Sequence, residues 1–239
     1  MIEKTLPPVR TTHLWRAPGG RWCYDLWGHH GRPVVLIPAV MFDRVMWWPA
    51  AADLRAYATV VAVDLPGHGV STARERYDPY ELVDELAQLV HRLGVRRAPV
   101  VIGHASSAPL AALFATQYAA HAVVIVDPPE APHPPAQLTE YFSGLGLDAI
   151  PACYRDMVTP GTDAGLLAAY AGCIDPGPVT GWATAAAQST RLAVHSQTPP
   201  HRLATGVGAE WRHEVYDVAG RFAHLTDVNR FVRDVRALL

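Results

Sequence analysis

The sequence has no long hydrophobic run. Its longest apolar stretches, such as residues 58–63 and 119–126, are far shorter than the roughly 18 residues that a membrane-spanning helix needs. Residues 1–5 also lack the apolar core of a secretory signal peptide. We therefore expect a cytoplasmic protein that does not enter a membrane.

Cysteine and charge are also scarce. The three cysteines, Cys23, Cys153 and Cys173, show no CxxC spacing, which argues against zinc or dithiol redox sites, and an odd count suits a reducing cytoplasm. Lys+Arg is 20 and Asp+Glu is 22, so the net charge is only -2 and a nucleic-acid partner is not expected. The 12 histidines show no convincing metal-ligand spacing, so we expect no metal and no cofactor.

Short hydrophobic segments are abundant, and hydrophobic residues make up 50% of the 239-residue chain. Runs that are apolar at almost every position lie at 34–37, 59–63, 99–102 and 122–126. Such runs are typical of strands buried on both faces of a parallel sheet. Helical patterns at 78–94 and 108–118 separate the later runs, and two aromatic-rich segments at 11–16 and 21–27 indicate a hairpin. The alternation predicts an α/β fold with a mostly parallel sheet.

The composition changes after residue 129. Residues 130–187 carry many prolines, and short helical stretches lie around 137–145, 149–158, 165–173 and 181–190. Strand–helix patterning resumes at 191–196. We therefore expect one structural domain, whose core (1–129 and 188–239) carries an inserted small helical cap. Tyr141, Tyr154 and Trp182 would give this cap an aromatic inner face for a bulky ligand, or would only attach the cap to the sheet.

Three segments resemble motifs of the α/β-hydrolase fold superfamily. Residues 64–71 (DLPGHGVS) resemble its D-x-x-G-x-G-x-S turn, residues 101–108 (VIGHASSA) its strand–elbow–helix segment, and residues 220–225 (GRFAHL) its late G-H-F-x-H-L loop. They occur in the family's order, and the match covers nearly the whole chain. The resemblance implies an α/β-hydrolase fold.

The catalytic positions depart from the family pattern. Ala105 occupies the nucleophile position of the G-x-S-x-G elbow, and Arg221 occupies the position of the histidine. No carboxylate stands near 196–198, where the acid is usually found. Asp127 follows the run 122–126, a position at which certain dehalogenases and cofactor-free dioxygenases of the family keep their acid. Asp127 would be either that acid or a turn-capping residue before two prolines. The resemblance therefore implies a degenerate catalytic triad.

Two residues offer substitutes for the missing groups. Ser106 directly follows the nucleophile position, but a shift of one residue would aim its side chain elsewhere. His224 lies one helical turn after the histidine position, where the family usually has a structural histidine.

Some of the family's polar groups survive these replacements because they belong to the backbone. By resemblance, the N–H groups of Val40 and Ser106 form an oxyanion hole. Arg221 would add a fixed cation beside a carboxylate, phenolate or enolate, or would be a surface residue.

The loop at 40–48 borders the substrate in relatives. In this chain it would contribute Met41, Asp43 and Trp47 to a binding site. The alternative for Trp47 is plain core packing.

These features favour a non-hydrolytic enzyme. We expect a cofactor-independent cyclase, lyase or isomerase that acts on a bulky, partly aromatic small molecule, with Arg221 and Asp127 as its catalytic residues. The chain is rich in Ala and Arg and poor in Lys, which resembles proteins of high-GC actinobacteria, where altered hydrolases occur in specialised metabolism. A non-catalytic ligand-binding protein and a residual esterase that uses Ser106 and His224 remain alternatives. Whether the chain forms a homodimer stays open.

Overall fold

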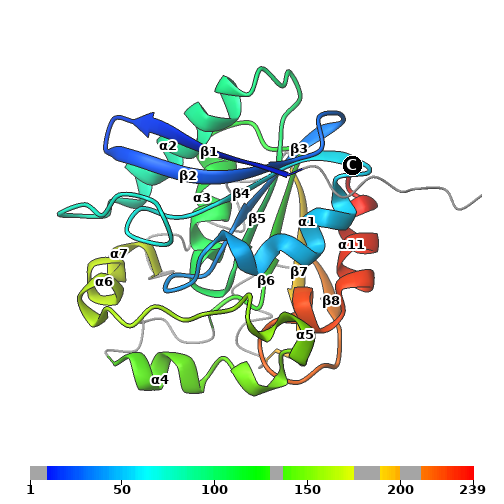
Figure 1. Cartoon of the computed structure of the whole chain (residues 1–239). Coiled ribbons are helices and arrows are strands. Elements are labelled where there is room, and N and C mark those ends of the chain that lie inside the picture. Colours follow the sequence, from blue (N-terminus) through cyan, green and yellow to red (C-terminus); the bar gives the residue numbers. More distant parts are fainter. Residues whose placement is uncertain (1–9, 130–136, 175–188, 200–210) are drawn as a thin grey trace, which may run out of the picture.

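A single eight-stranded sheet organises the chain (Figure 1). The computed structural model describes residues 10–129, 137–174, 189–199 and 211–239. The sheet order is β1-β2-β4-β3-β5-β6-β7-β8. Its strands are β1 (Arg10–Ala17), β2 (Gly20–Trp27), β3 (Arg32–Ile37), β4 (Ala58–Val63), β5 (Val100–His104), β6 (Ala122–Val126), β7 (Thr190–His195) and β8 (Arg212–Val215). The strand β2 runs antiparallel to β1 and β4, and all other neighbours are parallel. This confirms the predicted mostly parallel α/β sheet.

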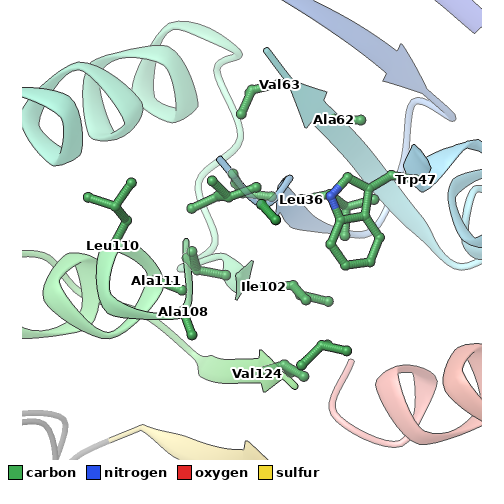
Figure 2. Packing of buried hydrophobic residues seen from close by; sticks show 14 of the residues in the cluster. Leu36, Trp47, Ala62, Val63, Ile102, Ala108, Leu110, Ala111 and Val124 are labelled. Atoms are coloured by element: carbon green, nitrogen blue, oxygen red, sulfur yellow. The ribbon is translucent and has the colours of Figure 1, made fainter. Parts of the chain in front are cut away.

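The central strands are buried on both faces. Every residue of β4, β5 and β6 is buried, as expected for runs that are apolar at nearly every position. Helices α2 (Pro79–Arg92) and α3 (Ala108–Gln117) pack together, as do α1 (Trp48–Leu54) and α11 (Val228–Arg236). Figure 2 shows Leu110 of α3 on one side of the sheet and Trp47 on the other. The core therefore lies in two layers around the sheet.

The helix α2 begins and ends where the sequence predicts. The Asp78 side chain accepts hydrogen bonds from the N–H groups of Tyr80 and Glu81, and Pro79 occupies the first turn. Gly94, with φ +67°, follows the helix. These are the start and stop signals of an isolated helix, so no tertiary information was needed to find it.

The segment after residue 136 forms only short helices. They are α4 (Leu138–Ser143), a 3₁₀ turn (Leu147–Ala149), α5 (Ala152–Arg155), α6 (Ala164–Ala169) and α7 (Ala171–Ile174). The stretch predicted at 149–158 is thus broken by Pro151, which lacks an N–H for a helix interior. The predicted helix at 181–190 lies largely outside the described residues. Both proposed boundaries of the cap also fall there, so this division of the chain stays a prediction.

Three helical elements were not predicted. A 3₁₀ turn (Arg44–Trp47) and the helix α1 follow β3, where the sequence indicated only a loop. The Asp43 side chain starts the turn by accepting a hydrogen bond from the N–H of Val45. A short helix, α10 (Ala223–Thr226), also precedes α11. In the described ranges, no helix has the length and hydrophobicity to cross a bilayer.

Candidate active site

Met41, Ala105 and Asp127 lie where the parallel strands end. Chain segments leaving β3, β5 and β6 meet at this edge, because parallel strands carry their carboxyl ends on the same side. Four non-glycine residues in the described parts have positive φ, and three of them are here: Met41 (73°), Ala105 (44°) and Asp127 (47°). Each such conformation costs on the order of 1–3 kcal/mol. Backbone strain is therefore concentrated at this edge.

The turn after β5 carries Ala105, the residue that the sequence predicts at the nucleophile position. Ala105 holds the left-handed conformation that the strand-to-helix turn requires, and only 4% of it is exposed. Gly103 is needed for close packing, because a Cβ there would collide with Ser107 O and lie 2.9 Å from Ala111 Cβ. The geometry that presents a serine in hydrolases here presents a methyl group.

A closed ring of hydrogen bonds fills the place expected for an oxyanion hole. The Val40 N–H donates to Ser106 Oγ at 2.8 Å, and the Tyr141 hydroxyl donates to Val40 O at 2.8 Å. Ser106 Oγ lies 2.7 Å from Tyr141 Oη. Since the single phenol proton goes to Val40 O, the Ser106 proton goes to Tyr141. The sequence predicts a free N–H at Val40, but the structure shows this N–H donating to Ser106 Oγ.

Tyr141 joins the segment after β6 to the core through this ring. It is buried, and burial raises the pKa of its phenol, an effect that Ser106 and the charge of Arg221 offset only in part. The phenol therefore stays protonated at neutral pH and acts as a donor. Next to it, Phe42 makes edge contacts with Phe142 (5.9 Å between ring centroids) and Phe222 (5.8 Å).

Asp127 holds three segments together. Its Oδ1 accepts the Ser196 N–H at 2.6 Å, and its Oδ2 accepts Ser196 Oγ at 2.8 Å and the Ala223 N–H at 3.2 Å. Burial raises the pKa of the carboxyl, and the hydrogen bonds and the charge of Arg221 oppose this. Asp127 thus connects the end of β6 to the end of β7 and to the late loop.

Arg221, which the sequence predicts at the histidine position, lies next to Asp127. Its Nη2 donates to the backbone oxygens of Asp127 (3.0 Å) and Pro128. Its own carbonyl accepts a hydrogen bond from His104 Nε2 at 2.7 Å. Together with Asp127 and His195, Arg221 lines a cavity of about 40 Å³, which is room for about one water molecule.

The histidines near the site pack against other buried rings. His224 is fully buried, and its ring lies 4.2 Å from that of Trp47 and 4.7 Å from that of His104. Neither of its ring nitrogens has a hydrogen-bond partner within the part of the chain that the structure describes, and burial lowers its pKa strongly. Since Ser106 bonds to Val40 and Tyr141 instead, the structure does not bring Ser106 and His224 together as a dyad.

His68, in the turn after β4, fixes the loop that follows β3. Its Nε2 accepts the Met41 N–H at 2.8 Å, and its Nδ1 lies 3.1 Å from Pro66 O, which assigns the proton to Nδ1. Burial lowers the pKa of His68 to about 4, so it is neutral at pH 7. The bond holds Met41 in its left-handed conformation.

The remaining predicted binding residues are dispersed. Trp47 is fully buried in the core, and Asp43 caps the 3₁₀ turn. Tyr154 lines a separate surface groove, and Trp182 lies outside the described residues. Met41 is 1% exposed, and its carbonyl accepts a hydrogen bond from the Gly161 N–H at 2.7 Å. Among the residues that the structure describes, no group of three or more His, Cys, Asp or Glu side chains forms a candidate metal site.

A protein-family comparison identifies the fold family. The model described as "Alpha/beta hydrolase family" matches residues 34–237. The chain belongs to the alpha/beta hydrolase family. A named relative, the dihydrolipoyllysine-residue acetyltransferase component of the acetoin cleaving system of Pseudomonas putida, is 36% identical over 85 residues. This match covers 35% of the chain and only 22% of that relative.

Solved structures share the architecture at low sequence identity. AqDC, in a structure described as showing ring-cleavage of the Pseudomonas quinolone signal, aligns with a TM-score of 0.78 at 18% identity, over 95% of this chain and 99% of AqDC. E-2-(acetamidomethylene)succinate hydrolase aligns with a TM-score of 0.76 at 16% identity, over 96% of this chain and 99% of that one. At these identities the similarity shows the fold alone.

Two contributors to the site of this family member were missed from the sequence. Ser196, which supplies two of the donors to Asp127, stands where a carboxylate was sought. His195 stacks on His213 with 5.3 Å between ring centroids and lines the cavity beside Arg221. The usable signal was their position at the end of β7, the strand that pairs with β6.

Proposed function

We propose that this chain is a non-hydrolytic member of the family that acts on its substrate without a covalent intermediate. The observation that carries the proposal is Ala105, which occupies an intact nucleophile elbow as a methyl group. Arg221 replaces the imidazole that would activate a nucleophile. Losing a triad serine or histidine lowers turnover on the order of a millionfold. Ordinary serine-hydrolase chemistry is therefore not supported.

The reaction class that fits the remaining groups is a cofactor-independent cyclisation, elimination or isomerisation. Asp127 is a buried carboxyl whose pKa is raised by burial, the direction that favours a role in proton transfer. A substrate oxygen that took the place of Tyr141 would meet the Ser106 hydroxyl as a donor. Orientation of the substrate alone can lower a barrier by roughly 7–11 kcal/mol in favourable cases.

The substrate class that we propose is bulky and partly aromatic. Since the cavity beside Arg221 is only about 40 Å³, such a substrate would have to displace the segment that carries Tyr141. Phe42 contacts Phe142 and Phe222, and Phe142 contacts Tyr141. The structural similarity to AqDC, whose ligand is a quinolone signal, is consistent with this substrate class.

One observation favours a second candidate, a ligand-binding protein without turnover. The polar groups of Val40, Ser106 and Tyr141 satisfy one another, and Arg221 binds backbone carbonyls. Buried groups that are already paired gain little from a new ligand oxygen.

A fluorophosphonate probe tests the loss of hydrolase chemistry. We expect no labelling of the wild type and no hydrolysis of p-nitrophenyl acetate above the buffer rate. The double variant Ala105→Ser with Arg221→His restores both missing groups on the intact elbow and serves as the positive control. Stoichiometric labelling of the wild type would contradict the proposal.

A substrate panel separates the two candidates. Aromatic ketones, phenols and hydroxyquinolones are incubated with the wild type, Asp127→Asn and Arg221→Ala. Turnover that falls at least tenfold in Asp127→Asn while binding persists supports an enzyme. Binding without turnover of any compound supports the ligand-binding protein.

A further inference from the structure

A second concave site lies away from the triad position, between α1, α5 and the α10–α11 segment (Figure 1). Its volume is about 510 Å³, within the usual range for small-molecule sites. The residues that carry its chemistry are Trp27, Trp48, Asp53, Tyr154, Thr226 and Asn229. None of its lining residues lines the cavity beside Arg221.

The two indoles of this groove already attract a cation. The Arg10 guanidinium carbon lies 3.8 Å from the centroid of the Trp48 ring and 5.7 Å from that of Trp27. The Trp48 Nε1–H donates to Asp25 Oδ2 at 2.8 Å, and donation to a carboxylate makes the indole face more negative. Arg10 does not line the groove, whereas both indole residues do.

The charged residue that lines the groove also favours a cationic ligand. Among its lining residues, Asp53 is the one with a charged side chain. The neighbouring arginines have other partners: Arg155 donates to the carbonyls of Asp148 and Ile150, and Arg230 pairs with Glu214. Arg10, which lies over the indoles, pairs with Asp25. A carboxylate beside aromatic rings is the combination that recognises organic cations.

We propose that this groove binds an organic cation that carries an aromatic or apolar body, such as a substituted ammonium. Trp27, Trp48 and Tyr154 supply the aromatic surface, and Asp53 supplies the opposite charge. Thr226 and Asn229 offer hydrogen bonds to a polar group on the body of the ligand. The site is independent of the proposed chemistry at Arg221.

Calorimetric titration with a matched pair of ligands tests this proposal. (4-Hydroxyphenyl)trimethylammonium and 4-tert-butylphenol have nearly the same shape and differ in charge. We expect the full-length protein to bind the cation about 2- to 30-fold more tightly than the neutral compound, the range that cation–π contacts give. Binding of the cation should also weaken as salt is raised.

Variants assign the binding to the groove. Asp53→Asn changes an exposed side chain and should weaken cation binding several-fold without affecting folding, and Trp48→Leu should weaken it at least as much. Asp84→Asn, an exposed aspartate on α2, is the matched control and should leave binding unchanged. Equal affinity for the two compounds, no binding of the cation at millimolar concentration, or binding that survives Asp53→Asn in a folded protein would overturn the proposal.

Discussion

The hydrogen-bond ring of Val40, Ser106 and Tyr141 makes a quantitative prediction for Tyr141→Phe. The substitution removes one hydroxyl and keeps the ring that packs at 5.4 Å from Phe142. It leaves the buried Val40 carbonyl without its donor and the Ser106 proton without its acceptor. A buried polar group left unpaired costs about 1–3 kcal/mol, so we expect the free energy of unfolding to fall by about 2 kcal/mol.

Urea denaturation and thermal melting measure this loss. At roughly 2–4 °C per kcal/mol for a domain of this size, the melting temperature should fall by about 4–8 °C. Tyr154→Phe is the matched control, because within the described chain the Tyr154 hydroxyl has no hydrogen-bond partner, and its cost should stay within about 0.5 kcal/mol. If Tyr141→Phe costs no more than Tyr154→Phe, the closed ring does not exist in solution.

A double-mutant cycle tests the ring as a unit. Ser106→Ala leaves the Val40 N–H without its acceptor and should also destabilise the protein. Because the two hydroxyls share one network, the double variant with Tyr141→Phe should cost less than the sum of the single variants, by about 0.5–3 kcal/mol. Strict additivity would show that the two side chains act separately.

Two further predictions concern acid stability and close packing. Folding lowers the pKa of His68 from its ordinary value of 6.5 to about 4. Neutral His68 therefore contributes its whole stabilisation above pH 6.5, and this contribution is lost as the pH falls from 6.5 to 4. The slope of unfolding free energy against pH should flatten in this window in His68→Gln, and an unchanged slope would exclude His68 as its source. Gly103→Ala should cost at least about 2 kcal/mol in urea denaturation because its Cβ has no room. Gly144→Ala, whose Cβ would lie 3.9 Å from its nearest neighbour, should change stability by less than about 0.5 kcal/mol, and equal effects would refute the packing argument.

Much of the core could be predicted because its signals are local. Apolar runs give buried strands, and Asp78, Pro79 and Gly94 give the ends of α2. The helix α1 was not predicted because Trp48 and its neighbours are also compatible with a binding loop. Packing against α11 favours the helix over the loop. The short helices after residue 136 depend on contacts with the core rather than on their own propensity.

For the candidate site, the sequence predicts where the residues stand in the chain but not which residues they contact. Motif order placed Ala105 and Arg221, since each stands at a fixed distance from a glycine of its motif. The partners of these groups were not predictable. Ser106 is 66 residues from Val40, and Tyr141 is 101 residues away from Val40, so no local pattern records that they meet.

Under the proposed function, alanine at position 105 and the closed hydrogen-bond ring are physically linked. A hydrolase must leave the N–H at the position of Val40 open to a substrate oxygen, although a buried N–H is costly without a partner. If the chain forms no acyl intermediate, as we propose, nothing requires that opening, and the Ser106 hydroxyl satisfies the N–H. A ligand that enters here must replace both the donor and the acceptor functions of the Tyr141 hydroxyl. Ligands with a hydroxyl or enol group satisfy this condition, whereas simple esters, which have no donor, do not.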